Sequence, residues 1–369
     1  MQFLWEDFSL ETPAMNSLKM MTPEAYQAFG KPVNYSFDQL SFLKSAIKES
    51  SRNRSRICTH DNSEEKLHEM FVIYGKDTYV RPNRHFGKDE SILVVEGSCD
   101  VYFFDLDGKI LEIVEMGDIA SNLPYYCRIP KEIFHTVVIN SDQVILFEAT
   151  SGPFDPEDTY YADWSPPEER REQIASFKQK LVEFKLRNRQ GKKQKRLVET
   201  NQNVYQEKEA LCWLSKSDRD FLWEKMRAKN LDRIRICSHQ DPSHLLHEML
   251  MLFSHDTYIR PSEHTDKEES LFILEGEGRY VFFDESGNVD EVVALGGPGT
   301  GKQNYCRVPK NTYHMLIVDS EYMLVKETTS GPFSRSDTIF PVWAEDYPAR
   351  QEARPYIESL EKQIGVKFG

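Results

Sequence analysis

Short runs of alternating apolar and polar residues, separated by turn-forming residues, make up most of the chain. Strands that turn one face to a core and the other to solvent give this pattern, and many in succession are typical of an all-β sandwich or barrel. The first half contains six such predicted strands, at residues 70–74, 92–95, 101–104, 110–114, 135–139 and 144–148. Residues 105–108 and 284–287 are hairpin-like turns, because each ends on a glycine that accepts positive φ.

The strand pattern occurs twice, because the chain contains an internal repeat. The segment from Arg54 to His60 matches the segment from Arg233 to His239 at a spacing of 179 residues, and this spacing holds without insertion as far as Trp164 and Trp343. We therefore predict two copies of one domain. The predicted division is 1–53, an N-terminal helical and extended segment; 54–170, barrel 1; 171–232, a helix, basic linker and helical lead-in; 233–345, barrel 2; and 346–369, a C-terminal helix.

Helical patterns flank each copy. Residues 37–50 and 216–229 precede the strands, and apolar residues recur at helix spacing after them: Ile174, Phe177, Leu181 and Phe184, then Ile357, Leu360 and Ile364. Each closing helix can pack outside its own barrel or against the other copy. We expect the barrels to pair as pseudo-twofold mates through strands and these terminal helices.

Charge and composition argue against some classes of partner and some cellular locations for this chain. The 369 residues carry a formal net charge of -14, so no overall basic field attracts nucleic acid or an anionic membrane. No apolar run approaches the length of a membrane span, the start does not resemble a secretory signal, and the six cysteines contain no CxxC pair. We expect a cytoplasmic protein with reduced thiols. The basic run from Lys178 to Arg196 is either a solvated helix end and linker or an anion contact.

Eight of the ten histidines form four pairs at the repeat spacing: His60/His239, His68/His247, His85/His264 and His135/His314. A glutamate follows the third pair by five residues, at Glu90 and Glu269, and can converge with the histidine across a turn. A later strand can then add His135 or His314. Two imidazoles and one carboxylate suit a divalent metal with open positions, Fe²⁺ first, with Mn²⁺, Ni²⁺ or Zn²⁺ as alternatives. The competing interpretation is a set of ordinary hydrogen bonds at strand ends.

The spacing His85-x4-Glu90-x6-Gly97 with Pro130-x4-His135, and its repeat from His264 to His314, resembles the two metal motifs of the cupins. The closer likeness is to the WbuC-type cupin-fold metalloproteins, and it covers residues 54–164 and 233–343. The resemblance implies an all-β-dominated chain of two tandem double-stranded β-helix (jelly-roll) barrels with flanking α-helices. It also implies a metal at each barrel centre, a pocket at each mouth and frequent links to carbohydrate metabolism.

One position departs from the cupin pattern. Cupins usually have a histidine two residues before His85 and His264, where this chain has Asn83 and Ser262. Three alternatives follow. Water can complete a three-ligand set, His68 and His247 can supply a replacement ligand, or one or both copies have lost the metal. On an alternating strand His68 shares a face with Met70 and Val72, which makes it a candidate ligand.

Further residues retained near the presumed mouths are substrate-binding candidates: Arg81, Arg260, Tyr126, Tyr305, Glu148 and Glu327. Arginine can hold a carboxylate or phosphate, but a structural ion pair is an equal alternative. We expect a metal-dependent enzyme for a small polar, sugar-derived molecule, either an isomerase or an oxygenase. The alternatives are a non-catalytic carbohydrate or small-acid binder and a pair with one degenerate site. A homodimer is a further expectation.

Overall fold

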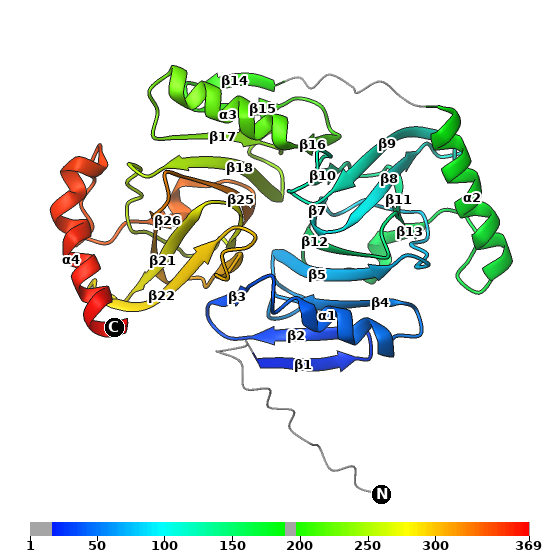
Figure 1. Cartoon of the computed structure of the whole chain (residues 1–369), viewed down its shortest axis with the longest axis horizontal. Coiled ribbons are helices and arrows are strands. Elements are labelled where there is room, and N and C mark those ends of the chain that lie inside the picture. The colour runs from blue at the N-terminus through cyan, green and yellow to red at the C-terminus, as the bar shows by residue number, and fades with distance from the viewer. Residues whose placement is uncertain (1–16, 189–196, 369) are drawn as a thin grey trace, which may run out of the picture.

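Two β-barrels of the same design lie side by side in the computed structural model, which describes residues 17–188 and 197–368 (Figure 1). The large sheet of barrel 1 has the strand order β1 (Ser17–Thr22), β2 (Ala25–Phe29), β4 (Arg54–Cys58), β5 (Leu67–Gly75), β12 (Gln143–Ser151), β7 (Glu90–Glu96), β10 (Tyr126–Ile129) and β16 (Cys212–Leu214). The facing sheet has the order β13 (Thr159–Tyr161), β6 (Asn83–His85), β11 (Phe134–Ile139), β8 (Ser98–Phe104) and β9 (Ile110–Gly117).

Barrel 2 repeats this plan. Its large sheet has the order β14 (Leu197–Asn201), β15 (Val204–Glu207), β17 (Arg233–Cys237), β18 (Leu246–Ser254), β25 (Tyr322–Ser330), β20 (Glu269–Glu275), β23 (Tyr305–Val308) and β3 (Val33–Tyr35). Opposite it lie β22 (Val289–Gly296), β21 (Glu277–Phe283) and β24 (Tyr313–Val318), with the pair β19 (Glu263–His264) and β26 (Thr338–Ile339). The predicted fold class of two tandem β-barrels is confirmed.

The hairpin turns show why the two copies fold alike. Gly108 has a φ of +84° and Gly287 a φ of +86°, and a Cβ on either would lie 2.8 Å from Cδ2 of the tryptophan beneath it, Trp164 or Trp343. Each position requires glycine for two reasons: the backbone has positive φ, and the tryptophan ring leaves no room for a Cβ. The same turn and the same tryptophan recur at the repeat spacing.

The helices cover the outside of the molecule. α1 (Ser41–Ala46), which continues into the 3-10 turn η1 (Ile47–Glu49), and α3 (Lys216–Ala228) are the lead-in helices, and η2 (Pro156–Asp158) and η3 (Arg335–Asp337) are short turns. α2 (Arg171–Arg187) and α4 (Arg350–Phe368) lie at opposite outer ends of the pair of barrels (Figure 1). Leu181 of α2 packs with barrel 1 residues Tyr102 and Phe104, and Ile357 of α4 packs with Val281 in barrel 2. The expectation that these helices join the barrels was wrong, because their apolar faces are buried on their own barrels.

The barrels are joined instead by an exchange of strands. β3 precedes barrel 1 in the chain but pairs with β23 of barrel 2, where Tyr35 lies opposite Tyr305. β16 precedes barrel 2 but pairs with β10 of barrel 1, where Leu214 lies opposite Tyr126. Each lead-in segment therefore completes the sheet of the other barrel.

A shared apolar core lies between the barrels. Phe71 and Phe147 of barrel 1 contact Phe272 of barrel 2 with ring centroids 6.3 and 5.5 Å apart, and Phe147 lies 5.2 Å from the ring of Tyr305. All four rings are fully or almost fully buried. Burial of this aromatic area stabilises the pair of barrels as one unit.

Buried glutamates connect the barrels beside this core. Glu69 of barrel 1 is fully buried and accepts hydrogen bonds from barrel 2, from Ser270 (2.5 Å), the hydroxyl of Tyr305 (2.8 Å) and Nη1 of Arg307 (2.8 Å). Glu248 of barrel 2 is bound by the equivalent residues of barrel 1, as the predicted pseudo-twofold relation requires.

Glu248 has one extra partner. Its Oε2 accepts from Tyr126 (2.6 Å) and Arg128 (3.2 Å). Its Oε1 accepts from Ser91 (2.6 Å) and lies 2.6 Å from the ammonium of Lys326. Burial alone would raise the pKa of Glu248, but the charges of Lys326 and Arg128 hold it below its usual value. Lys326 occupies the position equivalent to Phe147, so the two halves of the interface differ in one charge.

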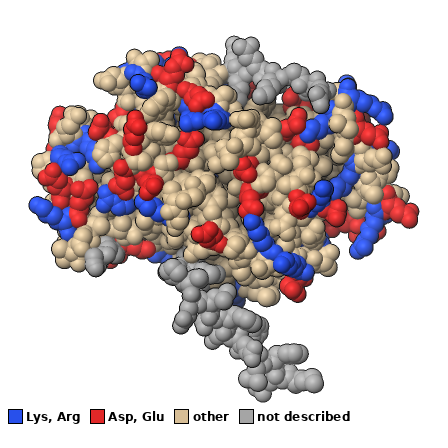
Figure 2. Space-filling model, viewed as in Figure 1, with Lys and Arg blue, Asp and Glu red and all other residues tan. Residues whose placement is uncertain are grey.

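The charges, helices and cysteines of the chain test the remaining predictions from composition. On one face, acidic and basic side chains are interspersed over both outer ends, with fewer charges across the middle (Figure 2). Within the described basic run, Lys185 pairs with Asp100 and Glu115, whereas residues 189–196 lie outside the described residues. None of the helices in the described ranges is long and apolar enough to span a membrane. All six cysteines are free thiols.

Candidate metal centres

Barrel 1 brings His85, Glu90 and His135 together. His85 ends β6 and Glu90 begins β7, and the turn between them is held by Asp158, whose Oδ1 accepts from the backbone nitrogens of Phe86 and Gly87. β11 pairs with β6 and adds His135 from the neighbouring strand. Glu90 Oε2 lies 3.2 Å from His85 Nε2 and 3.5 Å from His135 Nε2. One ligand atom of each residue lies within 4.8 Å of the others, so the group can hold a metal ion.

Barrel 2 forms the equivalent group from His264, Glu269 and His314. Glu269 Oε2 lies 3.0 Å from His264 Nε2, and Oε1 lies 3.6 Å from His314 Nε2. The surroundings of this carboxylate differ from those of Glu90. Lys267 Nζ lies 3.1 Å from Oε2, and the hydroxyl of Tyr280 donates to Oε1 at 3.3 Å.

The histidine rings are oriented by their other nitrogens. Nδ1 of His135 lies 3.2 Å from the carbonyl of Ile133, and Nδ1 of His314 lies 2.9 Å from the carbonyl of Thr312. A carbonyl only accepts, so each Nδ1 carries a proton, and Nε2 is the nitrogen that remains to bind a metal ion. This is the tautomer that a metal-binding histidine uses, fixed by a hydrogen bond from behind.

The electrostatics of barrel 1 favour an ionised carboxylate in the group. Burial alone would raise the pKa of Glu90, but the charge of His135 and contacts from both histidines hold it well below its usual value. Burial would lower the pKa of His135, whereas Glu90 raises it. The negative charge at Glu90 is therefore kept in a closed, low-dielectric place where a cation would be strongly attracted.

A divalent metal fits the barrel 1 group. Glu90 Oε2 is buried and has no hydrogen-bond partner, although both Nε2 atoms lie near it. A buried carboxylate oxygen without a donor is costly unless a cation completes it. Two imidazoles and one carboxylate are also a suitable donor set for a borderline divalent ion with positions left open.

The fourth cupin position is taken by Asn83 in barrel 1. Asn83 lies directly opposite His135 and lines the cavity, and its amide nitrogen donates to the carbonyl of Arg81 at 3.0 Å. The amide oxygen is the atom left over for a ligand role. Ser262 takes the equivalent place opposite His314.

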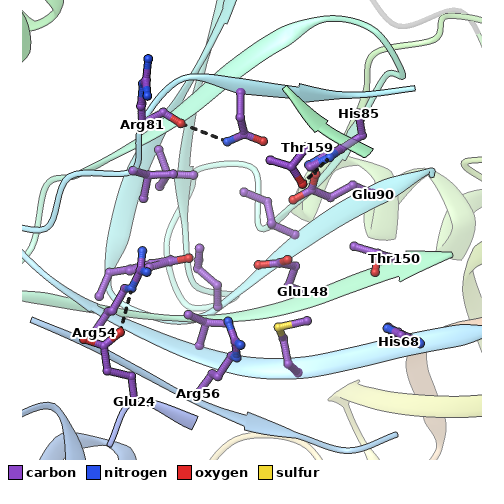
Figure 3. Close-up of a pocket in the computed structure, with 18 of the residues that line it drawn as sticks. Glu24, Arg54, Arg56, His68, Arg81, His85, Glu90, Glu148, Thr150 and Thr159 are labelled. Carbon is purple, nitrogen blue, oxygen red and sulfur yellow. Dashed lines mark hydrogen bonds and ion pairs between the residues drawn. The ribbon is translucent and has the colours of Figure 1, made fainter. Parts of the chain in front are cut away.

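His68 and His247 do not join the metal groups. His68 stacks on His60 with ring centroids 4.2 Å apart, and His247 stacks on His239 at 4.1 Å. His68 does line the cavity together with Met70 and Val72, as strand alternation predicts, but Figure 3 shows it well apart from His85 and Glu90. Neither histidine belongs to a metal-holding group among the described residues.

Each group opens into a cavity. Cavity 1, in barrel 1, has a volume of about 450 Å³, and cavity 2, in barrel 2, has a volume of about 520 Å³. Arg54 and Arg56 lie on one side of cavity 1, and His85 with Glu90 lies on the other (Figure 3). Arg233 and Arg235 line cavity 2 in the same way, so each cavity combines a carboxylate group with cationic side chains.

The predicted substrate residues fall into three groups. Arg81 and Arg260 line the cavities, but part of each guanidinium is used by the chain: Arg81 donates to Ser165 and Ala162, and Arg260 donates to Ala344. These partners are a hydroxyl group and carbonyl groups, and neither arginine forms the predicted structural ion pair with an acid of the described residues.

Glu148 and Glu327 line cavities 1 and 2. Burial, followed by the charge of Glu90, raises the pKa of Glu148 from 4.5 to about 7, and burial with the charge of Glu269 does the same for Glu327. Each is a carboxyl group that can carry a proton near neutral pH, beside but outside its metal group.

Tyr126 and Tyr305 lie elsewhere. Their hydroxyls are buried between the barrels on Glu248 and Glu69, and neither lines cavity 1 or cavity 2. Their geometry supports an interface role rather than contact with a substrate.

Sequence reasoning missed Arg56, Arg235 and Lys267 as cavity residues. The signal for the arginines was present, because Arg54-x-Arg56 and Arg233-x-Arg235 repeat at alternate positions of a strand and so share a face. Nε of Arg235 is buried without a hydrogen-bond partner. Lys267 was also retained, because an equivalent lysine, Lys88, stands in the first copy. Retention did not indicate that only Lys267 pairs with its glutamate.

Comparison with known families gives one match. The model of a domain of unknown function, DUF6016, matches residues 36–116 and 214–295. The two segments end at the repeat spacing, which supports the duplication, and together they span less than half of the chain. The sequence matches none of the curated proteins.

Solved structures share the two-barrel architecture. A variant of salicylate 1,2-dioxygenase from Pseudoaminobacter salicylatoxidans in complex with gentisate superposes with a TM-score of 0.54 at 13% identity, over 84% of this chain and 86% of that chain. Another structure of this dioxygenase gives a TM-score of 0.53 at 12% identity, over 82% and 84%. A cupin 2 conserved barrel domain protein from Leptotrichia buccalis gives 0.41 at 9% identity, over 75% and 89%. At such identities the dioxygenase likeness shows the fold alone, which is two tandem jelly-roll barrels. The narrower WbuC-type resemblance stays a prediction.

Proposed function

We propose that this protein is a metal-dependent enzyme whose metal centre is His85, Glu90 and His135 in barrel 1, acting on a small organic acid in cavity 1. One observation carries the proposal. The buried Oε2 of Glu90 has no hydrogen-bond partner, and Nε2 of His85 and Nε2 of His135 lie 3.2 and 3.5 Å from it.

The donor set bears on which metal binds. Two imidazoles and one carboxylate occupy one face of an octahedral ion, and this set with open positions is typical of Fe²⁺ in non-haem oxygenases. Fe²⁺ is our first choice, and Mn²⁺, Ni²⁺ and Zn²⁺ are alternatives. Asn83 can add a neutral oxygen ligand from the strand position opposite His135.

The cavity lining supports an acidic substrate over a neutral sugar. Arg54, Arg56 and Lys88 line cavity 1, and Arg54 shares its charge with Glu24 at 3.4 Å. A volume of about 450 Å³ suits a small metabolite. A carboxylate held by these cations would point its remaining atoms toward His85 and Glu90. The sugar-derived substrate stays a prediction.

Residues of the chain would transfer protons and orient the substrate. When bound, the metal would provide Lewis-acid or redox chemistry at the open positions. Glu148 lines the cavity on β12, and its raised pKa lets it hold a proton near neutral pH and release it to, or take it from, a bound substrate. The arginines fix the acid group at a distance from this carboxyl, and the barrel wall excludes bulk water.

Two reaction classes follow from this arrangement, a metal-assisted isomerisation and an oxidation by dioxygen. They are separated by measuring oxygen consumption with small carboxylates, including salicylate and gentisate, in air and under anaerobic conditions. Turnover that persists without oxygen supports isomerisation, and turnover that stops supports oxidation.

Metal analysis tests the proposal itself. Protein purified without a histidine tag and loaded anaerobically with Fe²⁺ should retain metal, and His135→Ala should lose the barrel 1 ion and the activity. His255→Ala is the matched control, because His255 has no equivalent at the repeat spacing and lies outside both groups. Full metal retention by His135→Ala would contradict the site assignment.

A further inference from the structure

The carboxylate in barrel 2 is already paired with a cation from the chain. Lys267 Nζ lies 3.1 Å from Glu269 Oε2, where His264 Nε2 also approaches at 3.0 Å. The hydroxyl of Tyr280 donates to the other oxygen at 3.3 Å. Both oxygens of Glu269 therefore have partners before any ion is added.

The equivalent carboxylate in barrel 1 lacks both of these partners. Tyr280 corresponds to Val101, a fully buried core residue without a hydroxyl group. Lys267 corresponds to Lys88, which lines cavity 1, but no ion pair joins Lys88 to Glu90 within the described part of the chain. Glu90 Oε2 is buried without a hydrogen-bond partner, whereas neither oxygen of Glu269 is in that state.

The difference decides where a metal can bind. An ion at the His264, Glu269 and His314 group would have to share Glu269 Oε2 with the ammonium of Lys267, which lies 3.1 Å from that oxygen. Two cations on one buried carboxylate oxygen repel each other. Displacing the ammonium would break a largely buried ion pair. Neither cost arises at Glu90.

We propose that Lys267 and Tyr280 take the place of the metal in barrel 2, so that each chain binds one divalent ion, in barrel 1. The inference rests on the proposed function for its barrel 1 half. The barrel 2 half stands on Glu269 and its partners alone. The duplicated motif is thus a metal site in one copy and an internal lysine–glutamate pair in the other.

The test is the metal stoichiometry of tag-free full-length protein, by elemental analysis after anaerobic loading with Fe²⁺ and by calorimetric titration with Mn²⁺. The wild-type chain should bind one equivalent, His314→Ala should still bind one, and His135→Ala should bind none. The double variant Lys267→Met with Tyr280→Val, which removes both the lysine and the tyrosine partner of Glu269, should bind two.

Matched controls isolate the lysine charge. Lys267→Arg keeps a cation beside Glu269 and should leave one equivalent, and Lys88→Met removes the equivalent lysine of barrel 1 and should also leave one. If the double variant unfolds, which circular dichroism would show, Lys267→Met alone still tests the proposal by a gain above one equivalent.

The outcomes separate the two proposals. Two equivalents in the wild-type chain, one of them lost in His314→Ala, would overturn this inference and leave the proposed function intact. No metal in the wild-type chain would overturn the proposed function. In that case a gain of one equivalent by the double variant still supports the role of Lys267 and Tyr280, and no gain overturns it.

Discussion

The two barrels keep the same skeleton and differ at a few side chains around equivalent carboxylates. Strand order, hairpin glycines and the histidine–glutamate–histidine group recur at the repeat spacing. Tyr280 and Lys267 contact Glu269. Their equivalents in barrel 1 are Val101, which has no hydroxyl group, and Lys88, which forms no ion pair with Glu90 within the described residues. A duplicated ligand set is therefore weak evidence for two metal sites, because the atoms that compete for the carboxylate decide which cation it holds.

The interface offers the same comparison at Glu69 and Glu248. Each accepts from a serine, a tyrosine and an arginine of the opposite barrel, but only Glu248 also meets a lysine, Lys326. The surplus cation adds charge to one half of an otherwise matched pair. Comparing variants of the two glutamates therefore measures how much the extra lysine contributes to the free energy of unfolding.

The largest expected effect tests that pair. Glu248→Ala leaves Lys326 buried without a carboxylate partner and leaves Arg128 only its pair with Asp89. Loss of one partner of a buried ion pair costs about 3–5 kcal/mol. Glu69→Ala removes one carboxylate partner of Arg307, which keeps Glu65 and Glu268 as partners. This variant should therefore lose less stability. Urea denaturation of both variants measures the difference. Equal losses would show that Lys326 adds nothing to the network.

A metal should stabilise the barrels unequally. Free Fe²⁺ or Mn²⁺ at 100 times its dissociation constant should add about 2.7 kcal/mol to the stability of the folded chain. We expect this gain in the wild-type chain and in His314→Ala, and its absence in His135→Ala. Thermal melting with and without the ion is the measurement, and a gain that depends on His314 would reverse the assignment.

A smaller effect concerns the cavity glutamates, which should behave alike. A carboxyl group whose pKa rises from 4.5 to about 7 on folding stays protonated in the folded chain while the unfolded chain ionises. Its contribution is fully present below pH 4.5 and is lost as the pH rises through about 7. At about 1.4 kcal/mol per pKa unit, reduced by cavity water, each glutamate should cost about 1–2 kcal/mol by pH 8.

Glu148→Gln and Glu327→Gln should each flatten that part of the stability curve by a similar amount. The measurement is urea denaturation of metal-free protein from pH 5 to pH 8. If neither variant changes the slope, the two carboxyl groups ionise normally in the folded chain.

The smallest expected effect is at the hairpins. Gly108→Ala and Gly287→Ala place a Cβ against Trp164 and Trp343 at positive φ, and each should destabilise the chain by about 1 kcal/mol. Because the two geometries match, the two losses in chemical denaturation should agree closely. A clear inequality would mean that the barrels unfold separately.

The sequence predicted the features that recur in both copies and those that depend on neighbouring residues in the chain. Strand alternation located the strands, the unbroken spacing predicted the duplication, and the motif from His85 to His135 predicted which side chains meet. The exchanged strands β3 and β16 could not be predicted in this way. Each is three residues long, and its partner lies in the other half of the chain.

The same limit explains the side chains that were misplaced. The retention of Tyr126 and Tyr305 predicted a role but not a location, and their partners Glu248 and Glu69 come from the opposite barrel. The apolar spacing of α2 and α4 predicted buried faces without indicating which surface covers them. In each case the missing information was a contact between distant parts of the chain.

The exchanged strands also bear on the ancestry of the protein. Tyr35 and Leu214 occupy equivalent positions, and each lies opposite the first residue of the strand that it completes in the other half. A half-length ancestor with this lead-in strand would have an unfilled sheet edge, and two copies would fill both edges by trading strands. Fusion of the two genes would then have joined an already interlocked dimer. Expression of either half alone should regenerate such a self-pairing dimer, a form in which the two metal-group variants of today could be studied one at a time.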